Sequence, residues 1–174
     1  LVPWFGNGRT IAEAVGRELE GCSWVGIPFA GGMPEVAFIN ARTILVNDLH
    51  RHVINLARVV ADDDMRPSLV RRLNRTIFHP DELRAAQETC LLVESGGEPD
   101  SMIDWAASYF IASWVGRSSR SGAKGEFDGG GATRWTSGGG DSAVRFQSAA
   151  RGVVEWGRIF RGCTFETMDA FDFL

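Results

Sequence analysis

The 174-residue sequence has few of the residues that build metal centres and disulfide frameworks. Its three cysteines, Cys22, Cys90 and Cys163, stand far apart, and neither a Cys-x-x-Cys pair nor a His-Glu-x-x-His motif occurs. Zinc sites and disulfide-stapled domains need such closely spaced ligands or cysteines. His50 and His52 have no paired His, Cys or carboxylate beside them, so we expect neither a metal site nor a nucleophilic triad. We predict a protein without a bound metal.

Long hydrophobic runs and an excess of positive charge are also absent. No run of about 20 apolar residues could span a membrane, and residues 1–15 lack the apolar core of a signal peptide. We therefore expect a cytoplasmic protein without a membrane partner, and, because the first residue is Leu rather than Met, a cropped chain. The net charge of −4 means that a nucleic-acid partner would require a local basic patch.

What the sequence does contain is an ordinary globular composition, with 44% hydrophobic and 23% charged residues. Residues 23–48 are its most informative stretch. A predicted strand over 23–27 leads into Pro-Phe-Ala-Gly-Gly (28–32), then a short helix from Pro34, a second strand over 43–46, and Asp48. Glycines after a first strand let a ligand approach the backbone closely. An acid after the next strand can bind the two hydroxyls of a ribose, so the pattern predicts the opening of a Rossmann-like nucleoside-cofactor site.

Each of these residues also has a purely structural interpretation. Asp48 could cap the helix that follows it, a position that Asp often occupies. Gly31 and Gly32 could simply form a tight turn. His50 and His52 are predicted to be surface residues or groups that support a neighbouring site.

Apolar spacing predicts helices in the rest of the chain, and a third strand near its end. The helices are expected over 10–20, 48–61, 67–78, 80–94, 101–114 and 143–161, and the strand over 163–168. Capping spacing occurs at Thr10-x-x-Glu13 and Ser101-x-x-Asp104. No strand pattern appears between residues 62 and 115. We therefore predict an α/β core with an incomplete sheet, formed by 1–61 and 143–174, and a helical insertion over 62–142.

The last part of this insertion, residues 116–142, is rich in Gly and Ser and is predicted to be an exposed loop. It also carries cations and an aromatic residue, which could contact phosphates and stack on bases. The alternative is a solvated linker without a partner. The candidate DNA contacts are Arg117, Arg120, Lys124, Arg134 and Trp135.

Short segments along the chain resemble, in the same order, motifs of one enzyme family. Residues 4–9 (WFGNGR) resemble W-x-G-G-K, and 28–32 (PFAGG) resemble E-P-F-x-G-x-G. Residues 46–49 and 53–56 (VNDL…VINL) resemble N-D-I-N…L-I-N-L. Residues 113–116 and 120–128 resemble N-G…R-x-N-x-x-G-x-F-N, and 164–174 resemble a strand that carries an acid. The chain is thereby similar to the Dam-type DNA adenine-N6 methyltransferases.

This resemblance implies S-adenosylmethionine as cofactor and double-stranded DNA as substrate. It implies that Asp48 binds the ribose hydroxyls and that Asp169, with Ala170 or Phe171, meets the adenine ring and its amine. The loop over 116–142 would belong to the target-recognition region. The residues implied around the methionine part are Trp4, Phe5, Gly6, Arg9, Pro28, Phe29, Ala30 and Gly31.

The sequence departs from the family pattern at several points. Ile27 stands where the family has an acid before Pro-Phe, Gly8 occupies the lysine position of the first motif with Arg9 beside it, and Gly122 replaces an asparagine. The catalytic Asp-Pro-Pro-Tyr motif does not occur, so we predict no catalytic residue within these 174 residues. The leading hypothesis is the cofactor- and DNA-recognising portion of such an enzyme. The alternatives are a degenerate, non-catalytic binding module and, less favoured, a dinucleotide-dependent oxidoreductase.

Overall fold

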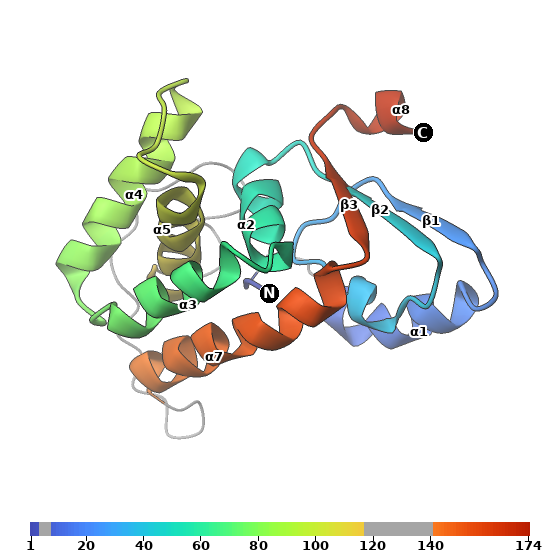
Figure 1. Ribbon diagram of the computed structural model, residues 1–174, viewed down its shortest axis with the longest axis horizontal. Coiled ribbons are helices and arrows are strands. Elements are labelled where there is room, and N and C mark those ends of the chain that lie inside the picture. The colour runs from blue at the N-terminus through green and yellow to red at the C-terminus, as the bar shows by residue number, and fades with distance from the viewer. Residues whose placement is uncertain (4–7, 117–140) are drawn as a thin grey trace.

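A three-stranded parallel sheet forms one side of the protein in the computed structural model, which describes residues 1–3, 8–116 and 141–174. The strands are β1 (Trp24–Ile27), β2 (Thr43–Asn47) and β3 (Cys163–Glu166), and β2 lies between the other two (Figure 1). In the register, Val25 faces Ile44, which in turn faces Cys163. All three predicted strands are confirmed, within two residues at either end.

Helices surround this sheet unevenly. In Figure 1 the helices α2 to α5 lie beyond the β3 edge, α7 runs from them towards β3, and β1 forms the opposite edge near α1. The order along the chain, with bounds, is η1 (Gly8–Thr10), α1 (Ala12–Glu18), η2 (Glu35–Phe38), α2 (Arg51–Ala61), α3 (Arg66–Arg75), α4 (Pro80–Glu94), α5 (Met102–Val115), α7 (Ser142–Phe160) and α8 (Ala170–Phe173). The elements described between residues 62 and 115 are all helical, as predicted.

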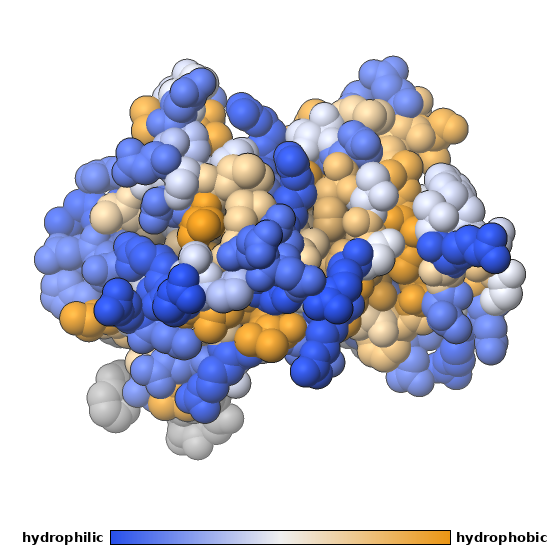
Figure 2. All heavy atoms as spheres, viewed as in Figure 1, coloured by the Kyte–Doolittle hydropathy of each residue, from blue (hydrophilic) through white to orange (hydrophobic). Residues whose placement is uncertain are grey.

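The hydrophobic core runs without interruption from the sheet into these helices. Tyr109, Phe110 and Ile111 of α5 are at most 1% exposed, and they meet Phe146 and Phe160 of α7 in the same cluster. The large aromatics of α5 therefore pack as core, as their helical spacing predicted. On the face shown in Figure 2, further hydrophobic residues gather over the strands, whereas hydrophilic residues predominate over α4.

Two predicted helix ends are wrong, and each error exposes an apolar side chain. Helix α2 begins at Arg51 rather than residue 48, which leaves Leu49 outside the helix and 69% exposed. Helix α3 ends at Arg75, so Ile77, predicted on its apolar face, is 71% exposed. Apolar spacing predicts the middle of a helix well but continues past its ends whenever the next residue happens to fit.

Of the two predicted capping boxes, one forms. The Ser101 hydroxyl accepts a hydrogen bond from the Asp104 backbone N–H at 3.0 Å and donates to the Asp104 carboxylate at 2.6 Å. Thr10 instead ends η1, and α1 starts from Ile11 without a side-chain cap. The ordered part of the chain includes no helix long and apolar enough to cross a bilayer.

Candidate functional site

A hollow of about 730 Å³ opens beside β1, between α1, η2 and the loop over residues 28–32. Its volume lies in the range of about 300–1,000 Å³ typical of small-molecule sites. Trp24 and Phe29 line it and are 55% and 74% exposed, so large apolar surfaces face its opening. Of the candidate site residues, Pro28, Phe29, Ala30 and Gly31 line this hollow.

The loop after β1 is a tight turn as well as a wall of the hollow. Gly31 has φ of +47° and Met33 has φ of +57°, both in the left-handed region that glycine tolerates and other residues rarely adopt. The Met33 N–H donates to the Ala30 carbonyl oxygen at 2.8 Å, which closes the turn. Met33 is 1% exposed, so burial of its side chain holds the unfavourable backbone angle in place. The two interpretations of the glycines therefore hold together.

Asn47, the last residue of β2, fixes this loop to the rest of the sheet. Its side chain is fully buried, and its amide nitrogen donates to the carbonyl oxygens of Pro28 at 3.2 Å and Met168 at 3.0 Å. Its Oδ1 accepts from the Met168 N–H at 3.0 Å. One buried amide thus ties together the chains that leave β1 and β3. Sequence analysis quoted Asn47 only as part of a motif and missed this role.

Asp48 also makes backbone contacts, although it is not the cap residue of α2. Its Oδ2 accepts from the Gly31 N–H at 2.7 Å, and its Oδ1 accepts from the His50 N–H at 2.8 Å. The residue is half-buried and stands behind the glycine turn, outside the lining of the hollow. Each carboxylate oxygen has a second lone pair, so the contacts leave acceptor capacity for hydroxyl groups.

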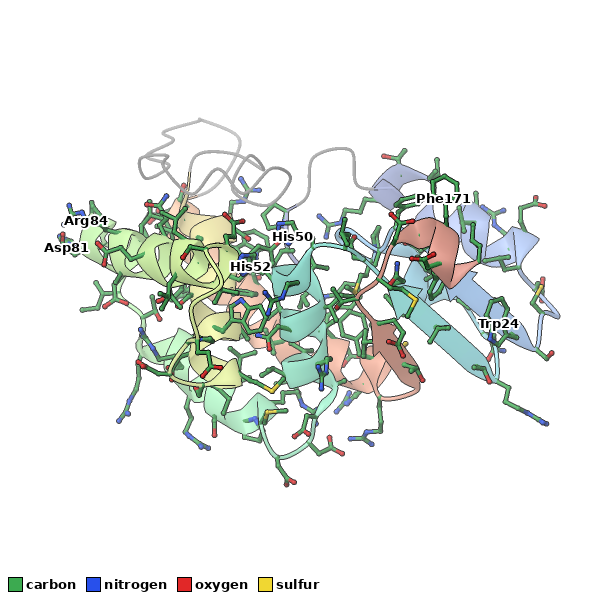
Figure 3. All side chains as sticks on the ribbon, turned by 90° about the horizontal axis from the view of Figure 1, so that it is seen from above. Trp24, His50, His52, Asp81, Arg84 and Phe171 are labelled. Atoms are coloured by element: carbon green, nitrogen blue, oxygen red, sulfur yellow. The ribbon has the colours of Figure 1, made fainter. Side chains whose placement is uncertain are left out.

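The residues after β3 form a separate group. The Asp169 carboxylate accepts from the Phe171 N–H at 2.8 Å and thereby caps α8. Ala170 is buried, whereas Phe171 is 87% exposed (labelled in Figure 3). None of these three residues lines the hollow. The structure therefore joins this group to the glycine loop only through Asn47, which bonds both Pro28 and Met168.

The remaining candidates divide between one described residue and those outside the described ranges. Arg9 lies on η1 and is exposed, and its neighbour Gly8 lines the hollow. The residues that lie outside the described part of the chain are Trp4, Phe5 and Gly6 at the N-terminal motif, and Arg117, Arg120, Lys124, Arg134 and Trp135 in the basic loop.

The prediction that His52 is a surface or supporting group is corrected in its first half, because its side chain is 3% exposed. The Trp105 indole N–H donates to His52 Nδ1 at 2.6 Å, and the ring stacks on Tyr109 with centroids 5.4 Å apart. The Glu94 carboxylate lies 3.6 Å from Nε2 and would favour the charged ring, but burial prevails. Burial foremost, and then the charges of His50 and Arg51, lower the pKa of His52 to about 3.

His50 and His52 sit at the start of α2, in the middle of the molecule (Figure 3). With Leu49, Arg51, Val93 and Glu94 they line a second hollow of about 240 Å³. Protonation of Nδ1 would break the bond from Trp105, so His52 is neutral with its proton on Nε2. The described residues include no group of three His, Cys, Asp or Glu side chains that could hold a metal ion.

One functional candidate that the sequence did not predict is Glu35, on the wall of the larger hollow. Burial raises the pKa of its carboxyl group. An acid directly after Pro34 is common in the first turn of a helix, where it favours the helix dipole. That ordinary explanation conceals the residue in the sequence, and only the placement of η2 against the hollow reveals it.

Comparison with known proteins adds no relative: no protein-family model matches the chain, and no curated protein matches it either.

Proposed function

We propose that this chain is the cofactor- and DNA-recognising portion of an S-adenosylmethionine-dependent DNA adenine-N6 methyltransferase with a Rossmann-like core. The observation that carries the proposal is the hollow at the carboxyl end of β1, lined by residues 28–31, with Asp48 bonded to the backbone of Gly31. In open parallel sheets, ligands bind at the carboxyl ends of the strands. The ordered set of motif resemblances turns this general site into a specific candidate.

The described residues suit the parts of that cofactor in different ways. The apolar wall formed by residues 28–30, with α1 opposite, fits the aliphatic chain of a methionine group. Asp48 has the acceptor capacity for ribose hydroxyls, and Asp169 with Phe171 offers an acid and an exposed ring for a base. When bound, S-adenosylmethionine would supply an electrophilic methyl group on its sulfonium. In this proposal the residues named here bind and orient the cofactor.

Methyl transfer itself is assigned to no residue of these 174. Such enzymes extrude the target adenine from the duplex and hydrogen-bond its amine, and the resemblance gives that role to the absent Asp-Pro-Pro-Tyr motif. The proposed partner is double-stranded DNA, contacted by the cations of the 117–140 segment and by Trp135. The proposed location is the cytoplasm.

Calorimetric titration with S-adenosylmethionine tests the cofactor proposal. We expect saturable binding, weakened about tenfold or more by Asp48→Ala, because a charge-assisted hydrogen bond contributes about 1.5–3 kcal/mol. Thermal unfolding of the variant shows whether it remains folded, since Asp48 also holds Gly31 and His50. No binding to the folded wild-type protein would contradict the proposal. Methylation of adenine in duplex DNA by the full-length protein tests the activity.

A second candidate is a non-catalytic module that binds DNA or a nucleoside. Ile27 favours it, because this 8%-exposed side chain lines the hollow where the resembled family has an acid. This candidate predicts binding of duplex DNA that is unaffected by S-adenosylmethionine and by Asp48→Ala. The methyltransferase proposal predicts instead that the cofactor binds and that Asp48→Ala weakens it.

A further inference from the structure

The larger hollow is apolar except at one point. Among the described residues that line it, Glu35 is the only one with a charged side chain. Its neighbours along the wall include Pro34 and Ile39, and the opposite wall carries Ile11 and Val15 of α1. A carboxylate in such surroundings loses hydration and gains no charge partner from the apolar side chains, so it favours a cationic ligand.

No ion pair in the described part of the chain includes Glu35. The one nearby cationic group is the amino group of Leu1, whose nitrogen donates to the Gly32 carbonyl oxygen at 3.3 Å. Burial above all, then Arg9, lowers the pKa of that amino group to about 5, while Glu35 opposes this shift. The group is therefore neutral at pH 7, and the Glu35 carboxylate has no lasting counter-charge.

The same observations identify a place for an ammonium group. An amino nitrogen already lies there, bonded to the Gly32 carbonyl and close enough for its charge to influence the pKa of Glu35. A carbonyl oxygen and a carboxylate together offer acceptors for the three donors of an ammonium group. Ile27, also on the wall of the hollow, offers none.

We propose that Glu35 binds the ammonium group of the methionine portion of the cofactor, as the substitute for the acid that is missing at residue 27. The inference rests on the proposed function, since it requires a nucleoside ligand that carries an amino acid. It assigns to η2 a recognition role that the motif resemblance does not include. The interaction is a non-covalent, charge-assisted hydrogen bond.

The test is a double-mutant cycle between protein and ligand, measured by calorimetry on the whole chain. One ligand is S-adenosylhomocysteine, and the other is the same molecule with hydrogen in place of its amino group. Both have a neutral sulfur, so the ammonium group is the only cation that differs. The variants are Glu35→Gln, which keeps the shape, and Glu18→Gln at the exposed end of α1 as the matched control.

We expect the wild-type protein and Glu18→Gln to prefer S-adenosylhomocysteine by about 10- to 100-fold. Glu35→Gln should bind both ligands with nearly equal affinity, close to that of the wild type for the deaminated ligand. A preference that survives in folded Glu35→Gln overturns the role of Glu35 and leaves the proposed function intact. Equal weakening of both ligands also overturns it, because that result would mean a structural effect. Failure of both ligands to bind the wild type overturns the proposed function and this inference together.

Discussion

Replacing Asn47 by Ala should destabilise the protein more than almost any other polar substitution. The side chain is fully buried and takes part in three hydrogen bonds, two to carbonyl oxygens and one from a backbone N–H. A typical hydrogen bond contributes about 1 kcal/mol net, and a buried group left without a partner costs about 1–3 kcal/mol. We therefore expect Asn47→Ala to lower the free energy of unfolding by about 3–5 kcal/mol, a large part of the roughly 5–15 kcal/mol of a typical domain.

Urea unfolding followed by circular dichroism measures this change as a lower midpoint with an unchanged slope. The matched control is Asn40→Ala, since Asn40 is exposed, and its effect should stay within about 0.5 kcal/mol. Asn47→Asp keeps the oxygen that accepts from Met168 but loses both donated bonds, so it should be at least as destabilising as Ala. A loss below 1 kcal/mol for Asn47→Ala would refute the reasoning, because water or a shifted backbone would then have replaced all three bonds.

Two further predictions concern packing and pH. Gly16→Ala should destabilise by about 1–2 kcal/mol in thermal or urea unfolding, because the added Cβ would lie 2.5 Å from the Phe38 carbonyl oxygen, whereas Gly152→Ala in α7 meets nothing within 4 Å and should stabilise by about 0.5–1 kcal/mol; equal effects would contradict the packing of α1 on η2. Because the pKa of His52 is lowered to about 3, the unfolded chain binds a proton that the folded protein excludes, so stability should fall on acidification from about pH 6.5 towards 3, by up to about 1.4 kcal/mol per pH unit. His52→Phe should remove that part of the slope while losing the bond from Trp105, and an unchanged slope would show that other groups cause it.

Local patterns in the sequence were sufficient for the strands and for most of the helices. Strand β2 was placed from its apolar run, and α4 from Pro80 at its first position to Glu94 at its last, both as the structure has them. The glycine loop was also recognised, because a Gly-Gly pair after an apolar strand is a local signal. Each of these features depends on residues within one or two turns of the chain.

The features that sequence analysis missed depend on contacts between distant residues. Helix α2 starts late because Asp48 binds the backbone of Gly31, 17 residues earlier, and of His50. Its neighbour His52 looked like a surface group because nothing near it in sequence announces Trp105, 53 residues away. Long-range partners of this kind leave no periodic signal. The same is true of Glu35, whose local context suits a helix start equally well.

The end of β2 links ligand binding to stability in a way that separates two kinds of residue. Asn47 and Asp48 are adjacent, and between them they hold the loop over 28–31, the start of α2 and the chain after β3. A ligand that contacts this loop would stabilise the folded protein in proportion to its concentration over its dissociation constant. Asn47→Ala should therefore lower both stability and affinity, because it releases the wall of the hollow. Glu35→Gln removes only a charge on the wall, so it should lower affinity and leave the stability of the free protein nearly unchanged.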